Sequence, residues 1–284
     1  MAQFNRDVRL TIDTPEGSVD ITELRIAFFI KKTNSWGANT AQVNIWNLNP
    51  DKRSKLRAFG DGLTLYAGYK DSAGTGLLFI GRTTQMSHQF EQPEIITSID
   101  CGDGERNLNS IQISVSFDPG TSVKKVIYEV ARKMGLTITQ YPNVNDSDFP
   151  NGWSYAGMGS EALAIACARL NVVFSVQNEN LVILAVNEVA KKPPHEINLN
   201  TGMIGIPQQY TYRSKYLPGA ARLIGWRVRS LLRPEILPGD EVILRSEKVN
   251  FNLDGNFKVI SIIHSGDTHG NPWDSTIELI PVVT

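Results

Sequence analysis

The last part of the chain alternates short apolar runs with turn residues. The runs are rich in β-branched and aromatic residues and cover 242–244, 257–263 and 276–283. Turn residues at 238–240 and 254–255 and a polar loop at 265–274 separate them. This alternation is typical of antiparallel strands joined by tight turns. It predicts a strand meander in a small barrel or sandwich.

An earlier stretch repeats this pattern at a constant spacing. Gly60 and Gly239 lie 239 − 60 = 179 positions apart, and Gly76 and Gly255 lie 255 − 76 = 179 positions apart. Residues 51–59 are additional in the first copy and predict a short helical turn. The spacing favours two copies of one β-domain within the chain. Chance recurrence of turn glycines, which are common in any β protein, is the alternative.

The segment between the two copies has a different pattern. From 123 to 134, apolar residues recur at the i, i+3, i+4, i+7 spacing of a helix, and Gly135 supplies a stop signal. A second apolar helix is predicted over 160–170. The remaining elements predicted here are strands at 111–117 and 136–138, a polar mobile loop over 141–159, and a hairpin of strands 172–177 and 181–186. This segment therefore predicts a compact α+β module.

These patterns divide the chain into three predicted domains. The fold class is mainly β with an α+β insert, in which two β-barrel domains flank the small module. The predicted boundaries are 1–108 for the first barrel, 109–190 for the insert and 191–284 for the second barrel. The linker Lys191–Pro194 contains two prolines, which hold the backbone extended at the last boundary.

Composition and charge exclude several classes of protein. The chain has 284 residues and a formal net charge of −1, with no long basic run, so it does not predict binding to nucleic acid phosphates. The N-terminus lacks the apolar core of a signal peptide, and no apolar window approaches the roughly 18 residues of a membrane span. Cys101 and Cys167 are too few for a disulfide framework and are expected to be free, buried thiols of a protein folded in a reducing cytoplasm.

One cluster of possible metal ligands stands out. His264, Asp267, His269 and Asp274 lie within eleven residues of one another, and imidazoles and carboxylates are ligands for zinc and other divalent ions. Their spacing matches no known ligand motif, and they lie in a predicted hairpin loop. Asp side chains populate such turns because they bond the local backbone. An ordered polar turn is therefore the favoured interpretation, and a metal site is the alternative.

Other candidate chemistry is weaker. The chain has no GxSxG motif, and the glycines at 102–104 match neither a P-loop nor a Rossmann turn. The carboxylates Asp100, Asp103 and Glu105 are interpreted as a loop surface rather than a glycosidase pair. Trp46 lies on the polar face of a predicted strand, either half-buried under the 51–59 turn or exposed as an anchor for another subunit. No residue is assigned a catalytic, cofactor-binding or metal-binding role.

The chain as a whole resembles a known family of structural proteins. The residues that carry the resemblance are IWNLNP, LTLYAGY, LLFIGRTTQ and IDCGDGE before the insert, and TGMIGIP, VRSLLRPEILPGDEVIL and GNFKVISIIHSGDTHGNPWDSTIEL after it. They are similar to the baseplate hub proteins of tailed bacteriophages (the hub or protein D-like family), which are related to the hub part of type VI secretion spike proteins. The most specific stretches are 231–242 and 255–278. The loop 214–222 is longer than this resemblance leads us to expect.

The resemblance implies an architecture and a function. In this family each chain carries two tail-tube-like β-barrels, and three chains form a ring of six similar domains. It implies a homotrimeric, non-enzymatic baseplate hub that joins the central spike to the tail tube and forms a conduit for DNA ejection. The implied partners are the tail tube or a tube-initiator protein, the central spike, baseplate wedge proteins and the tape measure protein. The implied location is the virion tail baseplate, with assembly in the host cytoplasm.

Two other functions remain as alternatives, and both predict different observations. A metal-assisted cell-wall hydrolase would use His264, Asp267 and His269. A carbohydrate-binding receptor module would use Trp36, Trp153 or Trp273 as stacking platforms. If the chain is instead a hub, DNA passes through the bore without specific binding, and we expect the excess of acidic groups to face that bore.

Overall fold

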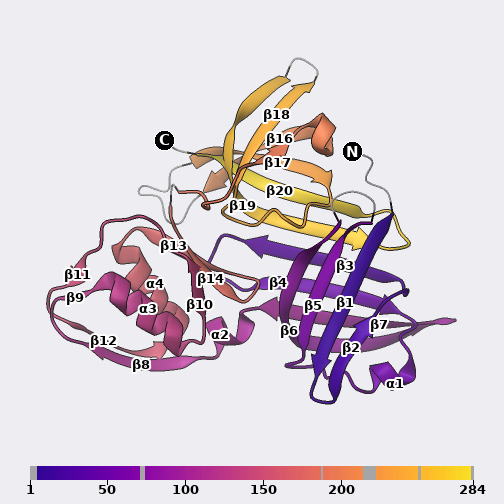
Figure 1. Ribbon diagram of the computed structural model, residues 1–284, viewed down its shortest axis with the longest axis horizontal. Coiled ribbons are helices and arrows are strands. Elements are labelled where there is room, and N and C mark those ends of the chain that lie inside the picture. The colour runs from indigo at the N-terminus through magenta and orange to yellow at the C-terminus, as the bar shows by residue number, and fades with distance from the viewer. Residues whose placement is uncertain (1–4, 71–73, 187, 214–221, 249–250, 283–284) are drawn as a thin grey trace.

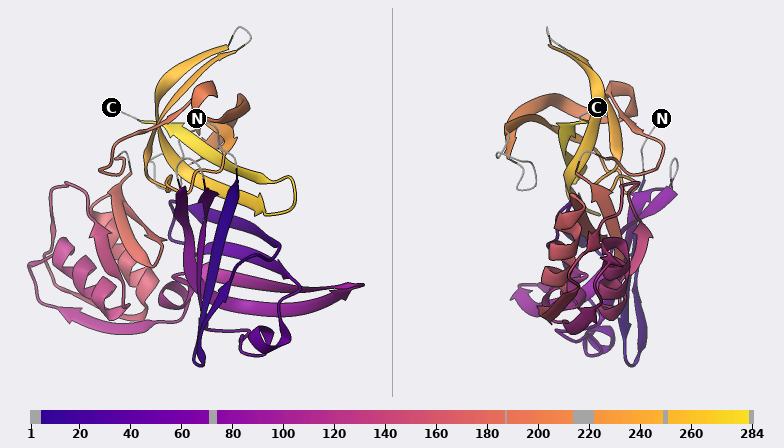
Figure 2. Two further views of the ribbon diagram at one scale, coloured as in Figure 1. Left: turned by 45° about the vertical axis from the view of Figure 1, so that its right-hand side comes forward. Right: turned by 90° about the vertical axis from the view of Figure 1, so that its left-hand side faces the viewer.

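The computed structural model describes residues 5–70, 74–186, 188–213, 222–248 and 251–282. Strands dominate, and most belong to one 13-stranded sheet that runs through both ends of the chain. A small α+β module from the middle of the chain lies beside this sheet, at the left of Figure 1. Figure 2 shows that the molecule is narrow when it is viewed from that side. The fold is mainly β with an α+β insert, as the sequence predicts.

The first half of the sheet comes from the N-terminal part of the chain. Neighbouring strands in it follow the order β3-β4-β7-β6-β5-β1-β2. Apolar residues alternate with exposed ones along these strands, so each strand has one face in the core. The elements are β1 (Arg6–Thr14), β2 (Gly17–Ile21), β3 (Ile26–Thr33), β4 (Asn39–Trp46), α1 (Pro50–Arg53), β5 (Gly62–Tyr69), β6 (Gly74–Glu91), β7 (Glu94–Asp103) and α2 (Glu105–Asn109).

The insert packs two helices between small sheets. Helix α3 begins at the N-cap Ser122, whose side chain accepts from the backbone N–H of Lys125, and it buries the predicted apolar stripe. Its elements are β8 (Gln112–Phe117), β9 (Thr121–Ser122), α3 (Val123–Lys133), β10 (Thr137–Gln140), β11 (Asp148–Phe149), β12 (Trp153–Met158), α4 (Gly159–Arg169), β13 (Val172–Gln177) and β14 (Asn180–Ala185). The predicted helices and hairpin are confirmed. The predicted mobile loop over 141–159 is wrong for 153–158, which pair with β8 along their whole length.

The second half of the sheet comes from the C-terminal part of the chain. Its elements are β15 (His195–Ile197), the 3₁₀ turn η1 (Leu199–Thr201), β16 (Met203–Arg213), β17 (Arg222–Leu231), β18 (Glu241–Lys248), β19 (Phe251–Asp267) and β20 (Trp273–Pro281). The predicted turn loop over 265–274 is shorter than expected, because β19 continues to Asp267 and β20 begins at Trp273. Most of the unusually long loop at 214–222 lies outside the described residues.

The two halves have the same strand order. The first half reads β3-β4-β7-β6-β5-β1, and the second reads β16-β17-β20-β19-β18-β15. The short helix α1 stands within the extra segment of the first copy, as predicted. One pairing differs, because β1 is antiparallel to β5 whereas β15 is parallel to β18. This agreement in topology supports an internal repeat rather than chance recurrence of glycines.

The predicted closed barrels are not confirmed. Within the described residues, the main path of the sheet ends at β2 and β16, and β18 and β15 form a branch from β19. No pairing joins β2 to β3 or β15 to β16, so neither half closes on itself. The reason is the length of β19. Its first part pairs with β18, but residues 261–267 pair with β3 of the first half, and the sheet continues instead of curling shut.

Three separate hydrophobic clusters fill the interior. The first half has a cluster from β1 to β7 that also takes in Leu232 and Trp273 of the second half. The insert has its own cluster around α3 and α4. The second half has a cluster built on β17 to β20 together with Ile197 and Met203. The first and second halves are therefore joined by shared core residues as well as by strand pairing.

Candidate functional site

The two halves meet where β3 lies antiparallel to β19. In this seam Lys32 is paired with Ile262, and Ile30 with His264. Alternate residues of a strand share a face, so these side chains lie on the core side of the sheet together. Lys32, Ile30 and His264 are each fully buried. The seam is thus an interior structure that contains two ionisable groups.

Gly266 allows the seam to close. A Cβ atom added at this position would lie 2.2 Å from Cζ of Phe28, the residue paired with it on β3. Interiors are packed to crystal density and leave no space for such an atom. The glycine is required here by the close approach of an aromatic ring, not by a turn.

His264 is held as a neutral imidazole. Its Nδ1 atom lies 2.8 Å from the hydroxyl oxygen of Ser275, its neighbour on β20. Burial and, in the same direction, the charge of Lys32 together lower the pKa of His264 to about 3. A proton on this ring would place a second cation in the core, so the histidine stays uncharged at neutral pH.

Two arginines fix the turn between β19 and β20. Arg25 donates to both carboxylate oxygens of Asp267, at 2.9 and 3.3 Å, and its guanidinium lies 4.2 Å from the ring centre of Trp46. Arg6 donates to the backbone carbonyls of Asp267, Gly270 and Asn271. Burial would raise the pKa of Asp267, but Arg25 and two backbone N–H donors outweigh it and lower the pKa.

The four candidate metal ligands therefore serve different neighbours. His264 bonds Ser275 inside the core, Asp267 bonds Arg25, and Asp274 accepts from Arg229 at 2.7 Å. His269 is exposed and lies 2.9 Å from the hydroxyl of Thr268. Among the described residues, no group of three or more His, Cys, Asp or Glu side chains is arranged to hold a metal ion. The arrangement corresponds to an ordered polar turn.

A buried polar junction attaches the insert to the first half. Asp103 accepts from the backbone N–H groups of Asn178 and Glu179, both at 2.7 Å, at the tip of the β13–β14 hairpin. Lys32 donates to the side-chain oxygen of Asn178 at 2.8 Å. Asn39 donates to Asp103 at 3.3 Å and to the carbonyl of Val176 at 2.7 Å. The hairpin tip is thus held by charged and amide groups.

The charges in this junction are strongly perturbed. Burial lowers the pKa of Lys32 to about 8, although Asp103 opposes the shift. Burial also raises the pKa of Asp103, opposed by its N–H donors and by Lys32. The N–H donors and the charge of Lys32 favour the carboxylate form of Asp103, and the charge of Asp103 favours the ammonium form of Lys32. Strand alternation could have found Lys32, because it continues the inward series Ile26, Phe28 and Ile30.

A second polar contact attaches the insert to the second half. The buried Lys258 of β19 donates to the carbonyls of Ala185 and Val186, at 3.3 and 3.1 Å, at the end of β14. Burial lowers its pKa to about 8. The linker that follows is also held, because Lys192 forms an ion pair of 3.3 Å with Asp240.

The carboxylates considered for glycoside hydrolysis have separate surroundings. Asp103 is buried in the junction, Glu105 accepts from the Asn109 amide at 2.6 Å, and Asp100 accepts from the Gln42 amide at 3.2 Å. Cys101 and Cys167 are free and buried, as predicted, and burial raises the pKa of each thiol to about 12.

Comparison with known proteins places the chain in a family. The model of a family described as baseplate hub gp41 matches residues 7–278. The chain belongs to this baseplate hub family. It is a structural component of a phage tail, and the hub is part of the virion tail. No curated protein sequence matches the chain.

Solved structures share the fold of this hub protein at low sequence identity. A 43 kDa tail protein of prophage MuSo2 from Shewanella oneidensis is 11% identical, with a TM-score of 0.64, and covers 97% of this chain and 98% of its own. A tail protein from Neisseria meningitidis is 9% identical, with a TM-score of 0.65 and 96% of each chain covered. An E. coli component of the type VI secretion system is 11% identical, with a TM-score of 0.62, and the match covers 96% of this chain and 77% of that protein.

The hub's tryptophans have different environments. Trp273 is buried and contacts Phe28 and Tyr69 edge to face. Trp153 of the insert is half-buried and stacks with Phe117, Phe149 and Tyr155. Trp46 is half-buried beneath Arg25. Trp36 is 45% exposed. Of the three stacking platforms considered, only Trp36 offers an open ring.

Several regions of the hub expose large apolar side chains, and two of these regions lie on its long strands. The outer part of the β6–β7 hairpin extends past the rest of the first half in Figures 1 and 2, and Phe90 near its tip is 66% exposed. Strands β16 and β17 expose Ile206 (48%) and Ile224 (56%). No helix of the described residues is long and apolar enough to cross a membrane. These regions are candidates for contact with other subunits.

Proposed function

We propose that this protein is a homotrimeric baseplate hub that joins the central spike to the tail tube and forms a conduit for DNA. The observation that carries the proposal is the equal strand order of the two halves. Three copies of a chain with two similar halves place six similar units around one axis. Such a ring adapts a threefold spike to a sixfold tube. The chain divides in this proposal into 1–108, 109–190 and 191–284.

On this proposal, the pairing of β3 with β19 serves as the model for the contact between subunits. Strand β3 stands at the edge of the first half, and residues 261–267 of β19 cover it. The equivalent edge strand of the second half is β16, which has no partner on its outer side among the described residues. The equivalent of β19 is β6, whose pairing with β5 ends at Arg82. We assign β16 of one subunit to the outer part of β6 of the next.

This contact repeats between chains the geometry that already exists within one chain. An interface of this kind uses two different surfaces and closes a ring when the rotation between subunits permits it. It also provides hydrogen-bond partners for the unpaired backbone N–H and C=O groups of two edge strands. Edge strands without partners promote aggregation. The closed ring would supply the barrel that a single chain does not complete.

The conduit is proposed to be neutral or slightly acidic. DNA binding strengthens with the number of phosphates that are neutralised, so a basic bore would retain the DNA during ejection. The chain's net charge of −1 fits passage without binding. A strongly basic bore in the assembled particle would contradict this part of the proposal.

The partners follow from the position of a hub. On this proposal, one end of the ring meets the tail tube or a tube-initiator protein, the other holds the spike, and the outside meets the wedge proteins. The tape measure protein is a further candidate partner. The hub is proposed to act without catalysis and to assemble in the host cytoplasm. The insert stands beside the sheet in Figure 1, and we assign to it contacts with neighbours other than the tube.

The decisive experiment measures the particle. Light scattering should give a mass three times 31.5 kDa, and electron microscopy along the axis should show a ring with six similar lobes. A monomer at all concentrations and with all tail proteins present would contradict the proposal.

Cysteine pairs test the interface between β16 and β6, because paired strands bring Cα atoms within disulfide range. Ser87→Cys is combined in turn with a cysteine at each of the positions 208, 209, 210 and 211. One of these four double variants should form an intermolecular disulfide, and the single variants should not.

A further inference from the structure

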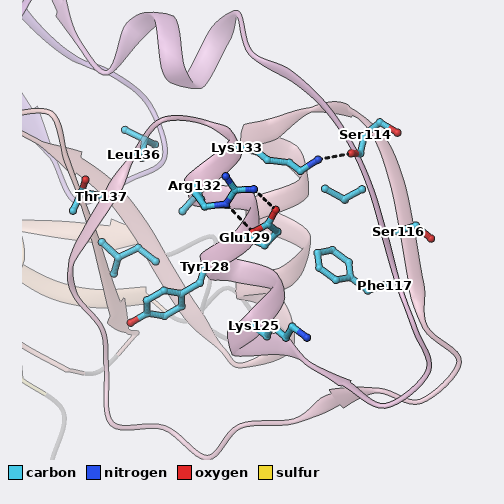
Figure 3. A pocket seen from close by; sticks show the side chains of 13 residues that line it. Ser114, Ser116, Phe117, Lys125, Tyr128, Glu129, Arg132, Lys133, Leu136 and Thr137 are labelled. Atoms are coloured by element: carbon cyan, nitrogen blue, oxygen red, sulfur yellow. Dashed lines mark hydrogen bonds and ion pairs between the residues drawn. The ribbon is translucent and has the colours of Figure 1, made fainter.

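A groove runs along the outer face of helix α3 in the insert. It has a volume of about 740 Å³. Ser114, Ser116 and Phe117 of β8 lie on one side of the helix, and Leu136 and Thr137 lie on the other (Figure 3). None of the contacts described above that join the insert to the two halves uses this surface. The groove is therefore a separate candidate site for binding.

Open strand edges form both flanks of the groove. Strand β8 pairs only with β12, and β10 pairs only with β14, within the described part of the chain. The β8 edge faces the helix, because Lys133 of α3 donates to the backbone carbonyl of Ser114 at 3.0 Å, and an added strand would replace Lys133 at this carbonyl. An exposed edge of this kind is a template on which an extended peptide adds as a further strand.

The lining of the groove is partly apolar. Val115 and Leu136 are buried in its walls, Phe117 and Ile138 are partly buried, and Tyr128 is 45% exposed. In β-strand addition, backbone hydrogen bonds provide affinity, and pockets for alternate side chains provide specificity. The half-covered aromatic and aliphatic groups supply such pockets for every second residue of a bound strand.

The charge of the groove is positive. Arg132 is occupied by Glu129, with contacts of 2.6 and 2.9 Å. Lys125 and Lys133 have no carboxylate partner among the described residues, and Glu129 is the one acidic residue in the lining. Carboxylates of a bound segment would form ion pairs with both of these ammonium groups. A lysine can also serve simply to protect a strand edge, and binding experiments separate the two roles.

We propose that this groove binds an extended, acidic segment of a partner protein, which adds as a strand to the free edge of β8. Its apolar residues face the helix, and its carboxylates meet Lys125 and Lys133. DNA is a poorer occupant, because the cations flank an apolar, strand-edged hollow and do not follow a phosphate track. The site belongs to the single chain and does not depend on trimer formation.

The first experiment measures binding of a peptide library to the full chain. The probes are decapeptides in which Glu or Asp alternates with Val, Ile, Leu, Phe or Tyr, and a matched library replaces the acids with Lys. Methyl NMR locates the bound peptide through the signals of Val115 and Ile138. We expect acidic peptides to bind and to shift these signals. No acidic peptide bound at 1 mM, or equal binding of the basic library, overturns the proposal.

The second experiment tests the charges. Lys125→Glu with Lys133→Glu should weaken peptide binding at least ~10-fold, because like charges then face each other in the groove. Lys52→Glu with Lys55→Glu makes the same change in net charge in and beside helix α1 of the first half and should weaken binding less than ~3-fold. Equal losses in the two variants overturn the site. So does a 20-base DNA strand that displaces the peptide and depends on the same two lysines.

The third experiment tests strand addition on the unaltered protein. In a strand, alternate residues direct their N–H groups to the same edge, so N-methylation of alternate residues blocks one edge only. Two versions of the best peptide, methylated at odd or even positions, should differ at least ~10-fold in affinity. Equal binding or equal loss overturns pairing with β8. This third experiment requires no protein variant, so it remains decisive if the lysine variants fold poorly.

Discussion

The two halves of the sheet have the same strand order but differ in what covers their edges. In the first half, β3 is covered by β19 of the same chain. In the second half, the equivalent strand β16 is at the end of the sheet, and Ile206 and Ile224 nearby are exposed. The edge strand of the first half is thus paired within the chain, and the edge strand of the second half is not. On the proposed trimer, the seam inside the chain would be the template for the contact between chains.

The two halves also hold the insert by different means. The first half uses the buried junction of Asp103, Lys32 and Asn178, whereas the second half uses Lys258 and two backbone carbonyls. The first attachment places opposite charges in the interior, and the second places one ammonium there. Removing a group from each attachment therefore tests which half controls the position of the insert.

The largest effect is expected at the junction. Asp103→Asn removes the carboxylate that accepts from Asn178 and Glu179 and faces the buried Lys32. Breaking a buried charge pair by removing one partner costs roughly 3–5 kcal/mol. Urea unfolding should show this loss, and proteolysis should cut the β13–β14 hairpin earlier.

Two further variants serve as comparisons for Asp103→Asn. Lys258→Met in the second attachment removes an ammonium whose partners are carbonyls, and it should cost less. Asp100→Asn affects only an exposed hydrogen bond to Gln42 and should change the free energy of unfolding by less than about 0.5 kcal/mol. A loss at Lys258→Met equal to that at Asp103→Asn would show that the halves hold the insert equally.

The next effect is expected in the seam. Gly266→Ala places a methyl group 2.2 Å from the Phe28 ring, and overpacking of this kind costs about 1–3 kcal/mol. Gly255→Ala is a matched control in the same strand, where the nearest atom lies 3.3 Å away on Phe257. Denaturant midpoints of the two variants give the comparison. Equal midpoints would mean that the seam is not tightly packed.

A pH effect of about 2 kcal/mol is expected from His264. Its pKa is about 3 in the folded chain and 6.5 when it is exposed, so the unfolded chain binds more protons between these values. The free energy of unfolding then falls as pH decreases below 6.5, by about 1.4 kcal/mol per pH unit. Between pH 6.5 and 5 the expected loss is therefore about 2 kcal/mol.

Variants separate His264 from other groups that titrate in this range. In His264→Gln the fall in stability between pH 6.5 and 5 should be smaller than in the wild type. In His269→Gln, which alters an exposed imidazole, the fall should remain. Unfolding curves at each pH supply the measurement. Parallel curves for the wild type and His264→Gln would show that the histidine is hydrated in the native state.

Much of the fold was predictable because hydrophobic spacing is a local property. The α3 stripe and the β13–β14 hairpin lie where the pattern places them. The offset of 179 positions located β18 and β20 relative to β5 and β7. Barrel closure was not predictable, because it depends on residues 261–267, which pair with β20 on one side and with β3 of the first half on the other. Alternation alone does not identify which strand covers which edge.

The polar residues of the site were predictable only in part. The metal hypothesis grouped His264 with Asp267 and His269 because they are close in sequence. Strand geometry separates them, since His264 points into the core, Asp267 is the last residue of β19 and His269 lies in the turn. Lys32 was overlooked, although its place in an inward-facing series was visible. Its partner Asn178 lies 146 residues away, and no local pattern reveals such a contact.

The smallest effect on a single chain, and the clearest test of the unfinished half, is expected at Ile224. Ile224 shares a face of β17 with Val228, but it is 56% exposed while Val228 is 1% exposed. Ile224→Thr should therefore change the free energy of unfolding of the monomer by less than about 0.5 kcal/mol, whereas Val228→Thr should cost about 1–3 kcal/mol. In the proposed trimer the order should reverse, with Ile224→Thr weakening assembly in sedimentation experiments, because on that proposal a neighbouring subunit covers this face. If Ile224→Thr leaves both stability and assembly unchanged, the exposed face of the second half is not where the subunits meet.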